Sequence, residues 1–364
     1  MSEALFDLDR PTYSVPSMAE ILGRDNGLTA VSTFSGCGGS SLGLHMAGWR
    51  IPYAVEFIPA ARETYAANFP GTYVDPRDIR QIEPGDILNR IGLDVGELDL
   101  LEGSPPCSSF ALVNNRRTKE ERFGSATVKD YSEGVKQATD DLFDEWLRLV
   151  AGLRPRALIA ENVPGLVIGE GRTFYLSILA RLADLGYRAE GDIYNAMHFG
   201  SATYRKRLVI RGIRDDVGAV PPRPPRTPYG FVLADALATM PAPSPADELH
   251  HASAEGYAIG QEWRTLGLGQ WSKRYTQVIR SSPDEPLPGI TQTGQSRGAA
   301  NPMHPHECRK FTPSELAWAF GYPADFIWPG TPAQRYERIG RSVAPPLYAA
   351  LGATLAETLT GVRA

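Results

Sequence analysis

Residues 28–57, LTAVSTFSGCGGSSLGLHMAGWRIPYAVEF, contain the pattern from which the architecture follows. An apolar run over 28–34 predicts a buried strand, the glycines at 36–39 predict a tight turn, and the apolar spacing after them predicts a helix. A second apolar run over 51–57 predicts another strand, and a helix over 59–68 follows it. Strand, helix and strand in this order predict a βαβ unit.

The same alternation continues along the chain. Further strands are predicted at 98–102, 157–160 and 208–211, with helices over 140–153 and 174–185 between them. The sequence therefore predicts an α/β fold built on a doubly wound, mostly parallel sheet.

A stretch rich in proline and arginine marks a domain boundary. Five prolines lie between residues 221 and 228, and the chain after them has weak periodicity, with a short strand predicted at 275–280 and a helix over 312–320. A final amphipathic helix over 345–359 can pack back on the first domain. We expect a first domain of residues 1–214 plus 336–364 and a small second domain of residues 215–335.

The composition is that of a folded protein. Of 364 residues, 42% are hydrophobic and 22% are charged, which argues against a disordered or fibrous chain. The three cysteines are too few and too scattered for a disulfide framework or a CxxC zinc site, so we expect no metal. The apolar runs are shorter than the roughly 20 residues of a membrane helix, and the acidic N-terminus does not resemble a signal peptide. We expect a cytoplasmic protein that binds no membrane.

The charge is unevenly distributed. A net charge of -5 would disfavour a polyanionic partner if it were spread evenly, but residues 203–230 contain seven arginines and lysines against two acids. A second basic cluster lies at 116–122. Each cluster is either a solvated loop or a contact surface for a polyanion, and its position relative to the catalytic residues must distinguish the two.

The glycine turn can place a nucleotide-like ligand at a helix N-terminus. Glu56, near the end of the second predicted strand, could accept both ribose hydroxyls of an adenosine-type ligand, and Asp78 could accept from an adenine amino group. Glycines are also needed for the backbone angles of tight turns, so a purely structural role stays open. From these residues alone, NAD and S-adenosylmethionine are both candidates.

Two further segments follow predicted strands and separate these candidates. Residues 103–110, GSPPCSSF, place Cys107 on a loop stiffened by two prolines. An isolated cysteine is usually buried filler, but a thiol held at the carboxyl end of a strand is well placed for nucleophilic catalysis. Residues 160–165, AENVPG, place Glu161 beside apolar chain, where it is a candidate proton donor with a raised pKa.

Taken in order, these segments resemble the cytosine carbon-5 DNA methyltransferase family. Each motif is short, but their order and spacing leave little room for chance. The stretch from about 222 to 288 lies outside the match, where this family has its target-recognition region. The matching segments are FSGCGG at 34–39, PPC at 105–107, ENV at 161–163, RKR at 205–207, RKFT at 309–312 with Glu315, FGYP at 320–323 and GRSVAPP at 340–346.

The resemblance implies a Rossmann-like methyltransferase fold with an irregular target-recognition domain. It implies an enzyme that flips a cytosine out of duplex DNA and methylates carbon 5 from S-adenosylmethionine through a covalent cysteine adduct. Cys107 would be the nucleophile and Glu161 the acid at ring nitrogen 3. Asn162 would hold the Pro-Cys loop, and Arg205 and Arg207 would act near the base.

The resemblance also implies which residues hold the two ligands. A monomer acting on double-stranded DNA is expected, with a cognate restriction endonuclease as a further partner. Cofactor contacts are expected from Phe34, Ser35, Gly36, Gly38, Gly39, Glu56, Phe57, Asp78, Ile79, Pro105, Arg341, Ser342 and Val343. Candidate DNA contacts are Arg116, Arg117, Lys273, Arg274, Arg280 and Arg297.

Three positions depart from the family pattern. Ser108 and Thr203 stand where glutamine is usual, and Arg341 stands where the family usually has asparagine, beside the methionine end of the cofactor. If Arg341 points outward, the change is harmless. If it points inward, its guanidinium would suit an S-adenosylmethionine carboxylated on the transferable methyl, because guanidinium binds carboxylate bidentately. The product would then be 5-carboxymethylcytosine.

Three other functions stay open. They are tRNA cytosine-5 methylation within the same family, a non-catalytic DNA-binding scaffold, and an NAD dehydrogenase. The proline linker and the insert before Arg309 favour duplex DNA over tRNA. A scaffold has no reason to keep all five candidate catalytic residues, and a dehydrogenase gives no role to the PPC and ENV segments.

Overall fold

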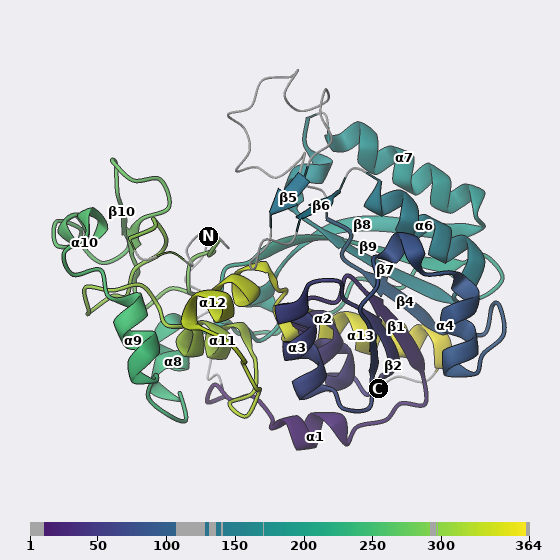
Figure 1. Ribbon diagram of the computed structural model, residues 1–364, viewed down its shortest axis with the longest axis horizontal. Helices are drawn as coiled ribbons and strands as arrows, with labels where there is room; N and C mark the ends of the chain where they lie inside the picture. Colours follow the sequence, from purple (N-terminus) through teal and green to yellow (C-terminus); the bar gives the residue numbers. More distant parts are fainter. Residues whose placement is uncertain are drawn as a thin grey trace.

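The computed structural model describes residues 11–106, 128–130, 136–139, 141–169, 171–291, 296 and 298–361. A seven-stranded sheet with helices on both faces lies beside a smaller lobe of short helices and long loops (Figure 1). Within the described ranges, no helix is long and apolar enough to cross a membrane.

The sheet has the strand order β3-β2-β1-β4-β7-β9-β8. Neighbours from β3 to β7 run parallel, whereas β9 runs antiparallel to both β7 and β8. The predicted doubly wound, mostly parallel sheet is thus confirmed, although the sequence analysis did not predict β3 and β8. The strands are β1 (Thr29–Thr33), β2 (Arg50–Val55), β3 (Tyr73–Asp75), β4 (Leu100–Gly103), β7 (Ala157–Asn162), β8 (Tyr187–Asn195) and β9 (Lys206–Arg214).

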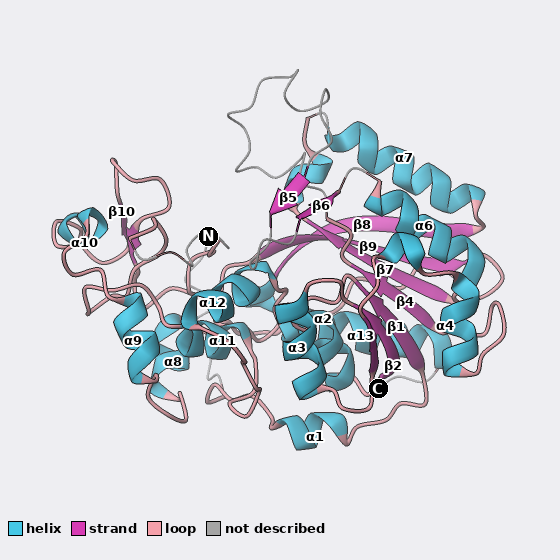
Figure 2. Ribbon diagram, in the orientation of Figure 1, coloured by secondary structure: helices cyan, strands magenta, loops and turns pink. Residues whose placement is uncertain are grey.

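Helices cover both faces of this sheet (Figure 2). The central strands β1 and β4 are buried throughout, because a sheet covered on both sides needs apolar residues on both. In α6, buried side chains such as Trp146 and Val150 recur at helical spacing and face the sheet. One face carries α2 (Gly39–Met46), α3 (Pro59–Asn68) and α13 (Pro345–Thr360), and the other carries α4 (Pro84–Ile91), α6 (Leu142–Leu153) and α7 (Gly171–Asp184).

The strand order creates a switch point between β1 and β4. The chain runs from β1 outward through β2 to β3, then returns to place β4 on the other side of β1. Open α/β sheets bind ligands at the carboxyl ends of the strands beside such a point. The glycine turn leaves β1 here, and Ser104, Pro105 and Pro106 leave β4 here. Because β9 is antiparallel, its first residues reach the same edge.

The smaller lobe is built from short elements. The strand predicted at 275–280 is found only at Ile279–Arg280, and Gln277 just before it has a positive φ of 83°, which extended backbone does not allow. One hydrophobic cluster contains residues on both sides of the predicted boundary, including Phe69 and Phe320, and the division into two domains stays a prediction. The elements are α8 (Leu233–Ala238), α9 (Ala246–Ala252), α10 (Ala258–Trp263), β10 (Gln270–Trp271), β11 (Ile279–Arg280), α11 (Pro313–Phe320) and α12 (Pro332–Arg341).

Further short elements flank the seven-stranded sheet. The N-terminal helix α1 lies below the sheet in Figure 1, and the pair β5 and β6 lies above it. The pair is antiparallel and forms a separate two-stranded sheet. Their bounds are α1 (Met18–Leu22), β5 (Val128–Asp130) and β6 (Lys136–Ala138).

Candidate active site

The glycine turn after β1 is closed on one side and open on the other. Phe34, Gly36 and Gly38 have positive φ angles of 53°, 57° and 90°. A Cβ atom on Gly39 would stand 2.5 Å from the Tyr322 hydroxyl and 2.9 Å from the Val343 carbonyl oxygen, so the turn leaves no room for a side chain there. At Gly36, by contrast, no other atom of the described residues lies within 4 Å of the Cβ position. A ligand can therefore approach the backbone at Gly36.

Glu56 joins the glycine turn to the end of β2. One carboxylate oxygen accepts a hydrogen bond from the Gly36 amide (2.6 Å) and the other accepts one from the Ile58 amide (2.7 Å). Burial raises the pKa of this carboxyl, while the two amides and the charge of Arg341 oppose that rise. Each carboxylate oxygen keeps a second lone pair, so Glu56 can still accept from ribose hydroxyls.

Asp78 and Ile79 lie at the start of the 3-10 turn Ile79–Gln81. The Asp78 carboxylate accepts from the Arg80 amide (3.0 Å) and forms an ion pair with the Arg80 guanidinium (3.0 Å). Phe57 is half-buried after β2, and Ile79 is buried. These residues follow the carboxyl ends of β2 and β3.

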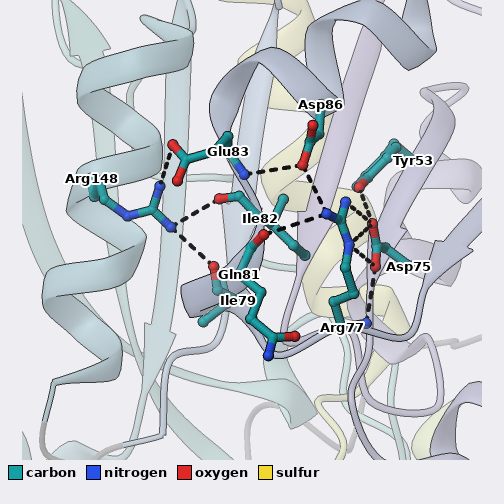
Figure 3. A network of polar contacts seen from close by, with 9 residues as sticks. All are labelled: Tyr53, Asp75, Arg77, Ile79, Gln81, Ile82, Glu83, Asp86 and Arg148. Carbon is teal, nitrogen blue, oxygen red and sulfur yellow. Dashed lines mark hydrogen bonds and ion pairs between the residues drawn. The ribbon is translucent and has the colours of Figure 1, made fainter.

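A polar network holds the segment that carries Asp78 and Ile79 (Figure 3). Arg77 bridges Asp75 at 2.7 Å and Asp86 at 2.9 Å, and the Tyr53 hydroxyl donates to Asp75 at 2.6 Å. From the other side, Arg148 donates to the carbonyl oxygens of Ile79 (3.0 Å) and Ile82 (2.9 Å). Charge-assisted hydrogen bonds of this kind, made here by partly exposed arginines, help to fix the backbone before any ligand arrives.

Glu161 and Arg207 meet at the carboxyl end of β7. The Arg207 Nε atom lies 2.7 Å from a Glu161 carboxylate oxygen, and the side chains are 17% and 11% exposed. This contact depends on the direction of β9: Glu161 pairs in register with Val209, so Arg207 lies on the same sheet face two residues nearer the edge. The two residues therefore form a largely desolvated pair at the carboxyl end of β7, next to β4 in the sheet.

Asn162 ties the end of β7 to the end of β4. Its side-chain amide donates to the Pro105 carbonyl oxygen (3.1 Å), and its side-chain oxygen accepts from the Val163 amide (2.9 Å). Pro105 is buried and directly precedes Pro106. Cys107 comes next and lies outside the described residues. Asn162 thus holds the segment from which the predicted nucleophile emerges.

Arg205 connects β9 to the smaller lobe. Its guanidinium donates to the Gly340 carbonyl oxygen (2.9 Å) and lies 5.2 Å from the centre of the Phe320 ring. Its backbone amide donates to the side chain of Asn195 (3.0 Å), a residue that the sequence analysis did not single out. Burial, together with the charge of Arg207, lowers the pKa of Arg205. Arg205 therefore orients the start of β9.

Arg341 is partly buried at the end of α12. Its side chain is 22% exposed and forms an ion pair with the buried Glu337, one helical turn earlier in α12. Its positive charge opposes the rise in the pKa of the Glu56 carboxyl. Ser342 donates to the Ile339 carbonyl oxygen (3.0 Å), and Val343 is buried behind the glycine turn.

Glu102 is a buried acid that the sequence analysis did not identify. It lies in β4, directly before the GSPPC segment, and it is fully buried. One carboxylate oxygen accepts from the Ser32 hydroxyl (2.7 Å). Burial raises the pKa of Glu102 to about 7, and the charge of Glu161 adds to this rise. The sequence feature that could have identified Glu102 is an acidic residue within the apolar run LDLLEG at 98–103.

The candidate DNA contacts differ in their surroundings. Lys273 and Arg274 are exposed, and Arg274 lies 5.1 Å from the Tyr275 ring centre. Arg280 donates to the carbonyl oxygens of Pro305 (2.8 Å) and Leu266 (3.1 Å), so its guanidinium is built into the lobe. The remaining candidates lie outside the described residues: Arg116, Arg117 and Arg297.

Comparison with protein families gives one match that spans most of the chain. The model of the family described as C-5 cytosine-specific DNA methylase matches residues 28–357. This range includes both the glycine turn and the final helix, as well as every segment on which the resemblance rests.

Individual relatives agree with this match. The chain is 27% identical to the type II methyltransferase M1.HphI of Haemophilus parahaemolyticus, with 88% of this chain and 84% of that protein covered. It is 28% identical to the type II methyltransferase M.Sau96I of Staphylococcus aureus, with 97% and 82% covered. Among solved structures, a candidate DNA modification methyltransferase from an E. coli prophage superposes with a TM-score of 0.71 at 21% identity, covering 92% of this chain and all of that one.

Proposed function

Because the chain belongs to the C-5 cytosine-specific DNA methylase family, we propose a role in catalysis for each residue that meets at this edge of the sheet. The protein is a DNA cytosine-5 methyltransferase, and its family uses S-adenosylmethionine. One observation carries the assignment of roles. Glu161 pairs with Arg207 at 2.7 Å, and the adjacent Asn162 donates to Pro105 at 3.1 Å, so acid, cation and nucleophile segment converge on one point.

The chemistry requires these groups. A cytosine inside a duplex is out of reach, so the base is flipped into the site. Its carbon 5 is a weak nucleophile until the Cys107 thiolate adds to carbon 6. Glu161 relieves the resulting negative charge by protonating ring nitrogen 3. After carbon 5 has taken the methyl group, its proton leaves to solvent, the carbon–sulfur bond breaks, and the nitrogen proton returns to Glu161.

The neighbours of Glu161 orient it and the nucleophile. Arg207 holds the Glu161 carboxylate in place and offers positive charge beside the base. Asn162 fixes Pro105 and hence the direction in which the chain continues to Cys107. Arg205 keeps the start of β9 against α12, so that Arg207 stays within reach.

The cofactor pocket fits S-adenosylmethionine. The open space at Gly36, the buried Glu56 carboxylate and the braced Asp78 segment would hold the adenosine. When bound, S-adenosylmethionine supplies an electrophilic methyl group. Ser342 and Val343, behind the glycine turn, would border its methionine end, and exposed Lys273 and Arg274 would contact DNA phosphates.

The function is tested by mass spectrometry of nucleosides from cells that express the protein. We expect 5-methylcytosine in the DNA, and none above background in cells with an empty vector. Purified protein given duplex DNA and tRNA in competition should methylate the DNA. Methylation of the tRNA alone would favour RNA as the substrate, and no modified cytosine in either nucleic acid would favour the scaffold.

A second candidate concerns the cofactor, because Arg341 is partly buried and its charge acts on Glu56. Its guanidinium could bind the carboxylate of a carboxylated S-adenosylmethionine, sharing that charge with Glu337. If so, Arg341→Asn should lower the ratio of 5-carboxymethylcytosine to 5-methylcytosine by about 10- to 100-fold, the value of one charge-assisted hydrogen-bonded contact. Both cofactors are supplied at equal concentration and both products are measured by mass spectrometry. An unchanged ratio means that Arg341 selects no cofactor.

We further propose that the enzyme acts in the cytoplasm as a monomer. The similarity to type II methyltransferases supports a cognate restriction endonuclease as a partner. Sedimentation of the purified protein with and without duplex DNA tests the monomer, and a mass of two chains on either sample contradicts it.

A further inference from the structure

Arg80 lies between two acids beside the proposed adenine site. It belongs to the 3-10 turn that follows Asp78, and its side chain is 29% exposed. On one side, its Nη1 atom donates to both carboxylate oxygens of Asp78, at 3.0 and 3.2 Å. On the other side, its Nε atom donates to a carboxylate oxygen of Asp141 at 2.8 Å, and its Nη2 atom donates to the second oxygen. The guanidinium therefore bridges two carboxylates that are far apart in the sequence.

Asp141 anchors this guanidinium to a helix of the core. It occupies the N-cap position of α6, whose buried side chains pack on the sheet. Two guanidinium nitrogens face two carboxylate oxygens, which is the bidentate arrangement that fixes an arginine in direction as well as in place. Hydrogen bonds to Asp141 raise the pKa of Arg80, although burial opposes the rise, and Arg80 in turn lowers the pKa of Asp141. The contact is thus made between two fully charged groups at neutral pH.

The bridge differs from the other contact that α6 makes with this segment. Arg148 of α6 donates to the carbonyl oxygens of Ile79 and Ile82, so it holds the backbone of the turn (Figure 3). Arg80 instead holds the Asp78 side chain, which also accepts from the Arg80 backbone amide at 3.0 Å. The direction of the Asp78 carboxylate is therefore set by Arg80.

The bridged carboxylate suits one kind of ligand edge. An ionised carboxylate has about four acceptor sites, so Asp78 can accept from Arg80 and from a ligand amino group together. Its side chain is 18% exposed, and a hydrogen bond made there is only partly screened by water. Two acids share one cation, so this group of three keeps a net negative charge. It attracts an amino group and repels a carbonyl oxygen.

We propose that Arg80 is a positioning residue, anchored by Asp141, that holds the Asp78 carboxylate in the direction from which it accepts from the adenine amino group of the cofactor. The inference rests on the proposed function, in which Asp78 contacts the adenine, and deepens it. Acting through Asp78, Arg80 selects a purine with an amino group at carbon 6 over one with a carbonyl oxygen there. Without Arg80, the carboxylate has to be ordered when the ligand binds, and part of the binding free energy is lost.

The test measures the binding of two compounds to the purified full-length enzyme by calorimetry. S-adenosylhomocysteine has an amino group at carbon 6 of the purine, and S-inosylhomocysteine has a carbonyl oxygen there. Wild type should bind the first about 10- to 100-fold more tightly, the value of one hydrogen bond to a charged group. Arg80→Met should reduce this preference by about 10-fold, and Asp141→Asn should reduce it in the same direction by less. Arg181→Met is the matched control, because it removes a surface ion pair with Asp144 of the same helix, and it should keep the wild-type preference.

A double-mutant cycle separates positioning from a merely structural role. Asp78→Asn should abolish the preference, because an amide can donate to a carbonyl oxygen as well as accept from an amino group. If Arg80 acts through Asp78, Arg80→Met then has little further effect in the Asp78→Asn background. Equal weakening of both compounds by Arg80→Met would leave the preference at its wild-type value, and that result overturns the proposal.

Two further outcomes are distinguishable from these. Asp141 is half-exposed, so Asp141→Asn is a mild change that provides the measurement even if Arg80→Met does not fold, and an unchanged preference in it contradicts the anchor. A wild-type enzyme that binds neither compound would contradict the proposed cofactor, and the role of Arg80 with it. Binding of S-adenosylhomocysteine with no preference over S-inosylhomocysteine would contradict the role of Arg80 alone.

Discussion

Replacing Glu161 with Gln should lower kcat for methyl transfer by about 10²- to 10⁴-fold, while KM for duplex DNA changes little. Glutamine keeps the size of the side chain and can still donate a hydrogen bond to ring nitrogen 3, but it cannot release a proton to it. It also loses the charge that faces Arg207 at 2.7 Å. Single-turnover kinetics with a saturating cofactor measure the effect, because they separate the chemical step from product release.

Glu190→Gln provides the matched control. Glu190 is a glutamate of β8 in the same sheet, its side chain is 65% exposed, and it lies 3.9 Å from the Arg211 guanidinium. Its replacement removes the same charge far from the switch point and should leave kcat at the wild-type value. If Glu161→Gln retains wild-type kcat, Glu161 is not the proton donor, and the role of the Glu161–Arg207 pair has to be reassigned.

Replacing Glu315 with Ala should destabilise the protein by about 3 to 5 kcal/mol, the range for breaking a buried ion pair from one side. Arg309 donates to both carboxylate oxygens of Glu315, at 2.7 and 2.8 Å, and both side chains are 8% exposed. Glu315 also accepts from the Thr312 amide (2.9 Å) in the capping box of α11. Burial favours a lower pKa for Arg309, but its ion pairs outweigh this and raise the pKa. Urea unfolding at neutral pH measures the loss.

Two further variants show whether burial of the ion pair is the cause of the stability loss in Glu315→Ala. Glu255→Ala breaks an ion pair with Arg264 in which both side chains are about half-exposed, and it should hardly move the urea midpoint. Replacing Arg309 with Met and Glu315 with Leu together should recover much of the stability lost in Glu315→Ala, because it also removes the buried guanidinium that would otherwise keep only the half-exposed Glu307 as its ionic partner. A Glu315→Ala protein as stable as wild type would show that the pair contributes nothing to folding.

The segments at the ends of β1, β4 and β7 could be predicted because their signals are local. Gly36 and Gly39 follow an apolar run, Pro105 follows another, and Glu161 closes a third. Parallel strands place their carboxyl ends at one edge, so these residues had to converge once the sheet was mostly parallel. Edge strand β8 gave a weaker signal, because only its two ends are buried and its middle has no alternation of buried and exposed residues.

Local sequence patterns were therefore sufficient to predict the family, the sheet, and the meeting of the glycine turn with the proline and Glu-Asn segments. Apolar periodicity and glycine turns depend on only a few neighbouring residues. Contacts between distant segments required the folded chain. The antiparallel direction of β9 brings Arg207 to Glu161, Arg205 donates to Gly340 of α12, and the buried Glu102 accepts from Ser32 on the neighbouring strand. Periodicity reports which face of an element is buried, but it does not report strand direction or which polar groups share the buried space, because those follow from packing between elements far apart in sequence.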